Sequence, residues 1–260
     1  MTRGVDPIHQ YLAAVRRAID QIEADQLDAI RDAASRFARS ILAGRLVHVF
    51  GTGHSRMAVE EMFPRYGSFP GFHPIVELSM TFHNPVVGAN GQRQAMFLEN
   101  VSGFGPVLWR NFATSPDDCL LAISSSGANA VTVDVAIEAK RLGMAVVALT
   151  SLANGAASTS KHESGRKLSE IADVVLDHHA PAGDSAVWID GLETPVAPVS
   201  SVSGCAVVNL VKAEVARVLT EAGQPPLALT SACHLGPERA RALFEATYDD
   251  YRRRIGVLYR

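Results

Sequence analysis

Apolar residues in the first 44 positions recur every three or four residues, which is the spacing of one buried helix face. The pattern begins after Asp6-Pro7, a helix N-cap followed by proline at the first helical position, and it ends at Gly44. Its phase slips near Asp25. We therefore predict one broken helix or two consecutive helices at the N-terminus, of the kind that packs on a sheet or on a second subunit.

From residue 46 onward, short apolar runs alternate with amphipathic stretches of helical spacing. The runs predict strands at 46–50, 74–78, 119–123, 145–150 and 174–177. The amphipathic stretches predict helices at 56–66, 130–142, 203–221 and 237–254, with a partly helical stretch at 94–110. Strands that alternate with helices form a parallel sheet covered on both faces. We therefore predict a single α/β domain over 1–260, with N-terminal helices in 1–44, the core in 45–225 and a C-terminal helix in 226–260.

The composition restricts the partners of the chain. Its 260 residues, 47% of them hydrophobic, are enough to bury a substantial core. A net charge of −3 without a basic block argues against a nucleic-acid partner. No apolar run approaches the roughly 18–20 residues that span a membrane, and the first residues lack a secretory pattern, so we expect a cytoplasmic protein. The three scattered cysteines are expected to be reduced thiols, because no Cys-x-x-Cys pair suggests zinc.

Two glycine- and serine-rich turns each stand directly between a predicted strand and a predicted helix. The first turn, GTGHS at 51–55, follows the strand at 46–50, and the second, SSSG at 124–127, follows the strand at 119–123. Such a turn exposes backbone N–H groups and hydroxyls at a helix N-terminus, a geometry that binds phosphate. Right-handed crossovers bring both turns to one edge of the sheet. The pair therefore predicts a site for a small phosphorylated metabolite.

Hydroxyls on both turns can face one phosphate, and the glycines let the backbone approach it closely. The residues expected to bind phosphate or sugar at the turns are Gly53, His54, Ser55, Ser124, Ser125, Ser126, Gly127 and Asn129. Serines at such positions also cap helices, so a purely structural role is the alternative for each turn taken singly.

A dinucleotide site is a rival interpretation of the first turn. Gly51-x-Gly53 begins the Gly-x-Gly-x-x-Gly pattern, but Arg56 stands where the third glycine would allow close packing of helix and strand. Glu77 could still serve as the acidic residue that ends the second strand, so a nucleotide-dependent oxidoreductase stays open as a hypothesis. A Walker phosphate loop is excluded, because no Gly-Lys-Ser/Thr follows the turn.

The pairing of a Gly-x-Gly-x-Ser turn with a later Ser-x-Ser-Gly turn resembles the sugar isomerase (SIS) domain family over about residues 40–225. Further segments resemble its UPF0309-type branch: GTGHS with EEMF at 60–63, TSL at 150–152, KHxSG at 161–165, ADVVLD at 172–177 and PxGD at 181–184. The resemblance implies a flavodoxin-like three-layer α/β/α fold, binding of phosphosugars, and assembly as dimers or tetramers. It also implies that Ser55, Ser124 and Ser126 hold the phosphate. Asn129 replaces a threonine of many relatives, which is expected to alter the ligand rather than abolish binding.

Aldose–ketose isomerisation needs one carboxylate or imidazole to move a proton between adjacent carbons, and a second group for the oxygen proton. Glu60 and Glu61 follow the first turn on one predicted helix. Adjacent helical side chains point roughly 100° apart, so the two cannot face one pocket equally. His83 and His162 are the candidate assisting groups, and Asp184 is expected to contact sugar hydroxyls.

We therefore expect a phosphosugar isomerase that needs neither a metal nor a nucleotide, with Glu60 or Glu61 as the proton shuttle. The alternative is a non-catalytic phosphosugar sensor that acts through a partner protein, because the wider family includes regulators that only sense sugars. A stand-alone DNA-binding regulator is disfavoured, since Arg and Lys do not cluster on a recognition helix in the first 45 residues. His178 and His179 face opposite ways on an extended segment, so no metal pair is expected there.

Overall fold

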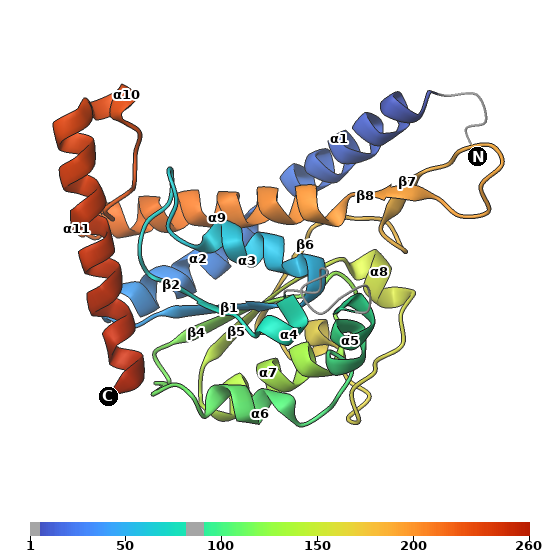
Figure 1. The fold of residues 1–260 in the computed structure, drawn as a ribbon, viewed down its shortest axis with the longest axis horizontal. Helices are drawn as coiled ribbons and strands as arrows, with labels where there is room; N and C mark the ends of the chain where they lie inside the picture. The colour runs from blue at the N-terminus through green and yellow to red at the C-terminus, as the bar shows by residue number, and fades with distance from the viewer. Residues whose placement is uncertain (1–5, 82–90) are drawn as a thin grey trace.

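A five-stranded parallel sheet forms the centre of the chain, with helices on both of its faces (Figure 1). The computed structural model describes residues 6–81 and 91–260. The strand order is β2-β1-β4-β5-β6. The strands are β1 (Val47–Gly51), β2 (Phe72–Ile75), β4 (Cys119–Ile123), β5 (Ala145–Thr150) and β6 (Val174–Asp177). This arrangement confirms the predicted flavodoxin-like three-layer α/β/α fold.

Alternating strand side chains build a separate hydrophobic core on each face of the sheet. Val47, Val49 and Leu121 point to one face, where they pack under helices α2, α3 and α9. Phe50 and Leu120 point to the other face, toward α6 and α7. The helices are α2 (Leu27–Leu42), α3 (Arg56–Met62), α6 (Phe104–Trp109), α7 (Ala130–Arg141) and α9 (Ser200–Glu221). Both cores are buried because every central strand is covered from both sides, which explains the continuous apolar runs in the sequence.

The N-terminal segment forms two consecutive helices, which is one of the two predicted alternatives. α1 (Pro7–Asp25) is capped by the Asp6 carboxylate, which accepts a hydrogen bond from the His9 N–H. The break falls at Gln26, whose side-chain oxygen accepts a hydrogen bond of 2.9 Å from the Asp177 N–H at the end of β6. α1 therefore leaves the sheet and lies beside a small hairpin, β7 (Ser185–Val187) and β8 (Val196–Pro198) (Figure 1).

Several element boundaries differ from the prediction, each for a local reason. α3 ends at Met62 instead of residue 66, because Phe63 is extended ahead of Pro64, which has no N–H to donate. The stretch predicted as partly helical at 94–110 is two helices, α5 (Gly91–Leu98) and α6, separated at Gly103 with φ +91°. Short elements that the pattern did not predict are α4 (Leu78–Thr81), α8 (Leu152–Ala156), α10 (Ala232–Leu235), the hairpin β7–β8 and three 3₁₀ turns, η1 (Gly53–Ser55), η2 (Leu168–Glu170) and η3 (Gly256–Tyr259).

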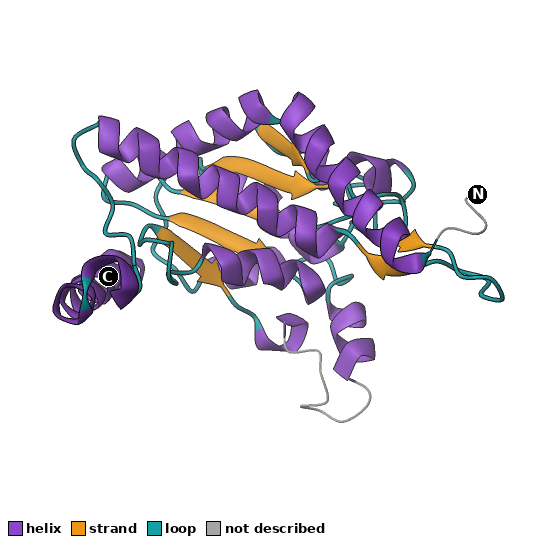
Figure 2. Ribbon diagram, turned by 90° about the horizontal axis from the view of Figure 1, so that it is seen from above, coloured by secondary structure: helices purple, strands orange, loops and turns teal. Residues whose placement is uncertain are grey.

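The C-terminal helix α11 (Pro237–Ile255) stands across the end of the sheet where the strands begin (Figure 1). Figure 2, seen from above, shows it beside the layers rather than within them. Hydrogen bonds tie it to the body, including one from the Tyr248 hydroxyl to the Pro64 carbonyl at 3.3 Å. Over residues 6–81 and 91–260, no helix combines the length and apolar character needed to cross a membrane. Cys119, Cys205 and Cys233 are free thiols.

A buried polar cluster lies near the amino ends of the central strands. The Nδ1 atoms of His48 on β1 and His73 on β2 are 2.9 Å apart, and the His48 Nε2 atom is 3.6 Å from the Asp118 carboxylate. Two hydrogen bonds from the Arg45 guanidinium, at 3.0 and 2.8 Å, hold that carboxylate. Burial, and the neighbouring His48, lower the pKa of His73 to about 3. The imidazole of His73 is therefore neutral in the folded protein at neutral pH.

Acidification should destabilise the fold through His73. Below about pH 6.5 the unfolded chain binds a proton at this histidine, whereas the folded chain resists protonation until about pH 3. Stability should therefore decrease as the pH falls from 6.5 toward 3, by at most about 1.4 kcal/mol per pH unit for this one proton. Urea unfolding measured in steps between about pH 6.5 and pH 5.5 tests the slope where most carboxylates are still ionised.

Two variants show whether this slope belongs to His73. His73→Gln should reduce the slope by about one proton equivalent, because glutamine does not titrate. His234→Gln, which removes an exposed imidazole on α10, is the control for the loss of a surface histidine. Burial also lowers the pKa of His178, so part of the slope should remain in both variants. An unchanged slope in His73→Gln would contradict the assignment.

Candidate functional site

The sheet reverses its direction of growth between β1 and β4. From β1 the chain moves outward to β2, and β4 then returns to the other side of β1. The register places Gly51, the last residue of β1, beside Ile123, the last residue of β4. The two turns therefore leave neighbouring strands at the same edge. In parallel α/β sheets such a switch point is where ligands bind.

The first turn combines tight packing at Gly51 with a left-handed backbone at Gly53. A Cβ atom on Gly51 would lie 3.1 Å from the Ser55 Cβ and 3.2 Å from the Ile123 carbonyl oxygen. Gly53 has φ +54°, a left-handed conformation that side chains disfavour. These glycines fold the turn back so that Ser55 stands at the start of α3, where its side chain makes no capping hydrogen bond. The Ser55 hydroxyl is therefore not used as a helix cap.

The second turn is ordered by its own hydroxyls. The Ser124 Oγ atom accepts a hydrogen bond of 3.1 Å from the Gly127 N–H, and the Ser126 Oγ atom accepts one of 3.3 Å from the Ala128 N–H. Asn154 donates to the Ser125 Oγ atom at 3.2 Å. A serine hydroxyl that accepts one hydrogen bond still has its proton to donate. The turn thus presents preorganised donors to a ligand.

The two turns line one cavity of about 250 Å³. Its lining residues are Thr52, Gly53, His54, Ser55, Gln92, Ala95, Met96, Glu99, Ser124, Ser125, Ser126, Asn129, Asn154, Asp184 and Ser200. The structure thereby brings together every residue predicted to bind phosphate or sugar except Gly127. Gly127 has φ +62° and shapes the turn from behind, next to Thr150 and Leu168.

Glu99, a carboxylate that the sequence reasoning missed, lies on this cavity. It follows α5, and the cavity residues Gln92, Ala95, Met96 and Glu99 are spaced as one face of a helix. The Thr52 hydroxyl donates a hydrogen bond of 2.7 Å to the Glu99 Oε2 atom. The helical spacing in 94–110 was the only indication of this helix in the sequence. It did not indicate that the helix face carrying Glu99 lies at the two turns.

Asp184 combines a structural role with a place on the cavity wall. Its Oδ1 atom accepts hydrogen bonds from the Val199 N–H at 3.1 Å and the Ser200 N–H at 2.8 Å. Its Oδ2 atom accepts one of 2.6 Å from the Ser200 hydroxyl. The Asp184 carboxylate therefore accepts hydrogen bonds from otherwise unpaired N–H groups at the N-terminus of α9. The positive end of the helix dipole stabilises its negative charge.

His178 lies behind the turns, in a cavity of about 20 Å³ that it shares with Ser55 and Ser125. That volume holds about one water molecule. The Ala180 N–H donates to the His178 Nδ1 atom at 3.3 Å, and burial lowers the pKa of the ring, so this imidazole is neutral. Its neighbour His179 turns away to the Asp25 carboxylate at 2.8 Å. Across the described ranges, no three His, Cys, Asp or Glu side chains gather as a metal site.

Glu60 and Glu61 do not line the cavity. The Glu60 side chain is 59% exposed, with the Arg56 guanidinium 4.0 Å away. Glu61 faces α9, where Asn209 donates to it at 3.2 Å and the Lys212 ammonium lies at 3.5 Å. Burial alone would raise the pKa of Glu61, but these partners and Arg65 lower it. Glu61 is therefore engaged in the α3–α9 contact.

His162 also lies outside the cavity. Its side chain is 6% exposed, and its Nε2 atom is 2.8 Å from the Asp134 carboxylate on α7. The same loop donates backbone hydrogen bonds from Lys161 to the Ala128 carbonyl and from Leu168 to the Gly127 carbonyl. His162 thus anchors a loop that supports the second turn. His83 lies outside the described residues.

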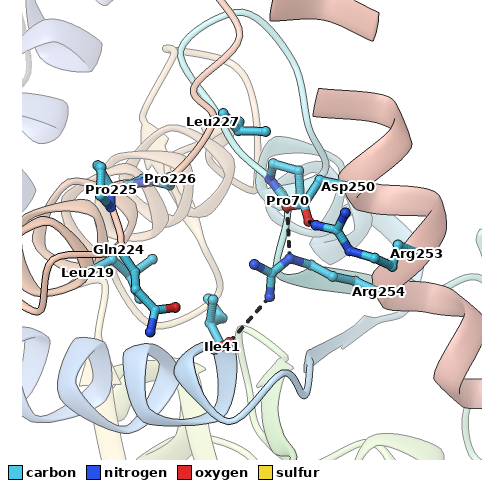
Figure 3. Close-up of a pocket in the computed structure, with 10 residues that line it drawn as sticks. All are labelled: Ile41, Pro70, Leu219, Gln224, Pro225, Pro226, Leu227, Asp250, Arg253 and Arg254. Carbon is cyan, nitrogen blue, oxygen red and sulfur yellow. Dashed lines mark hydrogen bonds and ion pairs between the residues drawn. The ribbon is translucent and has the colours of Figure 1, made fainter. Parts of the chain in front are cut away.

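A second cavity, of about 200 Å³, lies between α11 and the connection after α9 (Figure 3). Ile41 and Pro70, which line it, precede β1 and β2, so this cavity is at the opposite end of the sheet from the turns. Its two arginines are both paired: Arg253 and Arg254 bind the Asp250 carboxylate, and Arg254 also donates to the Ile41 carbonyl at 3.3 Å. Both guanidinium groups already pair within the protein, where they attach α11 to the body. We therefore regard the cavity at the two turns, and not this one, as the candidate ligand site.

A family model of the SIS domain matches residues 10–151. The UPF0309 protein of Geobacillus kaustophilus is 32% identical over 252 residues, which cover 96% of each chain. The UPF0309 protein of Geobacillus thermodenitrificans is 31% identical over 252 residues, covering 96% of this chain and 97% of the relative. These matches confirm the resemblance drawn from the motifs.

Solved structures show the same fold at low sequence identity. A phosphoheptose isomerase from Francisella tularensis superposes with a TM-score of 0.52 at 18% identity, covering 80% of this chain and 95% of that one. The phosphoheptose isomerase from Neisseria gonorrhoeae gives a TM-score of 0.50 at 15% identity, covering 82% and 97%. These likenesses establish the architecture of the chain.

Replacing Asp184 should destabilise the protein at the start of α9. Asp184→Ala removes three hydrogen bonds at this helix N-terminus and should lower the free energy of unfolding by about 1–2 kcal/mol. Asp184→Asn, which keeps an acceptor and tolerates the positive φ of this position, should lose less. Urea unfolding measures both, with Asp20→Ala on the exposed face of α1 as the control. Equal stability of Asp184→Ala and Asp20→Ala would be incompatible with the capping role.

Proposed function

We propose, for a chain that belongs to the SIS domain family and to its UPF0309 group, that the cavity at the two turns binds a phosphorylated sugar and isomerises it between aldose and ketose. One observation carries the proposal: two hydroxyl-rich turns from adjacent parallel strands line a single cavity that also holds a carboxylate. A homodimer or homotetramer in the cytoplasm is part of the same proposal.

The phosphate would be held by neutral donors. Ser55, Ser124 and Ser126 come from both turns and line the cavity, and Asn129 lies at the start of α7 beside them. Hydroxyl and backbone N–H donors fixed in place lose little freedom when an anion binds, which favours recognition of a phosphate group. The glycines of the turns allow the backbone to approach it.

Glu99 is the group that we assign to proton transfer. In this reaction a base removes the proton from the carbon next to the carbonyl, an enediolate forms, and the same base returns the proton to the neighbouring carbon. Glu99 lines the cavity, and the Thr52 hydroxyl fixes its Oε2 atom. The Asp184 carboxylate already accepts hydrogen bonds at the N-terminus of α9. Glu60 and Glu61 lie outside the cavity, so we assign the shuttle role to Glu99 in their place. His54, also on the wall, is our candidate for the oxygen proton, and His83 stays a prediction.

A phosphosugar sensor without catalysis is the second candidate. It is favoured by the fate of the predicted catalytic groups: Glu61 and His162 hold the fold together, and Glu60 faces solvent. In that case Glu99 would recognise a sugar group instead of moving a proton. Both candidates share the phosphate-binding cavity and differ only in turnover.

Deuterium exchange separates the two candidates. The protein is incubated in deuterated water with a panel of aldose and ketose phosphates, and label at carbons 1 and 2 is followed by NMR. For an isomerase, Glu99→Gln should reduce the exchange rate by about 10²–10⁴-fold while the ligand still binds, because only the base is lost. Glu60→Gln is the matched control and should exchange like the parent protein.

Each result has a defined meaning. Binding without label uptake for every ligand would reject the isomerase and leave the sensor. Full activity in Glu99→Gln with loss in Glu60→Gln would return the shuttle role to α3. No binding of any sugar phosphate, measured by calorimetry, would reject both candidates.

A further inference from the structure

His178 is a buried histidine that has no part in the proposed reaction. It follows the last residue of β6, and 3% of its surface is exposed. The Ala180 N–H donates a hydrogen bond of 3.3 Å to its Nδ1 atom, so this nitrogen acts as an acceptor. Burial lowers the pKa of His178, although the Asp177 and Asp184 carboxylates act in the opposite direction. The ring is therefore neutral near pH 7 and carries its proton on Nε2.

The Nε2–H group of His178 lacks a hydrogen-bond partner in the part of the chain that the structure describes. The other contact of the ring, to the Ser203 hydroxyl at 3.4 Å, is also at Nδ1. Packed atoms enclose the Nε2 atom of His48, but they do not enclose that of His178. The space beside the His178 ring is the cavity of about 20 Å³. Because buried N–H groups are almost always paired with protein or ordered water, a water molecule in this cavity is the expected acceptor.

The small cavity shares a wall with the candidate phosphate site. The side chains that line both cavities are those of His54, Ser55, Ser125 and Ser200. Ser200 already donates its hydroxyl proton to Asp184. Ser55 makes no capping hydrogen bond, and Ser125 accepts one from Asn154 and keeps its own proton to donate. The hydroxyls of Ser55 and Ser125, one from each turn, are therefore the groups that can connect the two cavities.

We propose that His178 positions phosphate-binding hydroxyls through one buried water, which accepts a hydrogen bond from Nε2–H and donates to the hydroxyl oxygens of Ser55 and Ser125. A buried water typically makes about three hydrogen bonds, which is the number that this arrangement supplies. His178 is not among the residues that line the larger cavity, so it is a positioning residue and not a catalytic one. The role rests on the proposed phosphosugar site, and it is the same for an isomerase and for a sensor.

The direction of these hydrogen bonds suits an anionic ligand. A serine hydroxyl that donated its proton to the water would turn an oxygen lone pair toward the phosphate and repel it. Since His178 can only donate from Nε2, the water accepts there and gives both of its protons to the serines. Each serine then directs its own proton into the larger cavity, where a phosphate oxygen accepts it. The Ala180 N–H, by fixing the tautomer of the ring, sets the direction of the whole chain.

Affinity for phosphate tests this role. Inorganic phosphate and the panel of aldose and ketose phosphates are titrated into the full chain at pH 7. His178→Leu removes the donor and should weaken the binding of inorganic phosphate, and of each sugar phosphate that binds, by about 3–10-fold. His178→Gln carries an amide N–H that can reach the position of Nε2, and it should recover most of the affinity. His179→Gln is the matched control, because the adjacent ring turns away to Asp25 and should not affect binding.

The tautomer and the water can also be observed in the unmodified protein. In a sample labelled with ¹⁵N-histidine, the nitrogen shifts of each ring report which atom carries the proton. A cross-peak between a ring N–H and a water of long residence time reports the buried water. For His178 we expect the Nε2–H form, a cross-peak to water, and a change of the Nε2–H signal when inorganic phosphate is added.

Several results would overturn the proposal and leave the phosphosugar site standing. One is phosphate binding by His178→Leu that is as tight as in the parent protein. Another is an equal loss in His178→Leu and His178→Gln, which indicates a purely structural role. An Nδ1–H tautomer in the unmodified protein is a third, and it decides the matter even if His178→Leu does not fold. If neither inorganic phosphate nor any sugar phosphate bound the parent protein, the proposal would fall together with the proposed function.

Discussion

The pairing of β1 with β4 is the constraint on which the candidate site depends. Its register sets Gly51 beside Ile123, so that turns separated by about 70 residues in the chain leave the sheet side by side. The contact is tight enough that a Cβ atom on Gly51 would press on the Ile123 carbonyl at 3.2 Å. Shifting this register by one residue would also exchange the two hydrophobic faces of β1, so the cores and the site are specified together.

Charge is distributed very differently at the two ends of the sheet. At the amino ends, Arg45 and Arg254 are matched to the buried carboxylates of Asp118 and Asp250, and these pairs attach neighbouring elements to the body. At the carboxyl ends, the described wall of the cavity consists mostly of neutral side chains, with the carboxylates of Glu99 and Asp184 and the imidazole of His54 among them. Ion pairs at one end hold elements together, and a polar surface with few such pairs forms the candidate site at the other end.

The catalytic residues predicted from the sequence illustrate why proximity to a turn along the chain does not place a side chain in a site. Glu61 is six residues after Ser55, yet it faces α9 and contacts Lys212. His162 lies in a loop that touches the second turn, yet its ring is turned toward Asp134 on α7. Glu99 is far from both turns in the chain but reaches them because α5 packs over the switch point, with Val131 donating to its carbonyl.

The sequence by itself determined the layers, the two turns and the helical N-terminus, because apolar periodicity and glycine act locally and leave a direct trace in the order of residues. The boundaries of α3 and of the α5–α6 pair were within reach, since Pro64 and Gly103 mark them. The tertiary structure alone decided which carboxylate faces the cavity and that Asp184 caps α9. Those outcomes depend on how helices rotate and pack against one another, and no local pattern records contacts between residues that are distant in the chain.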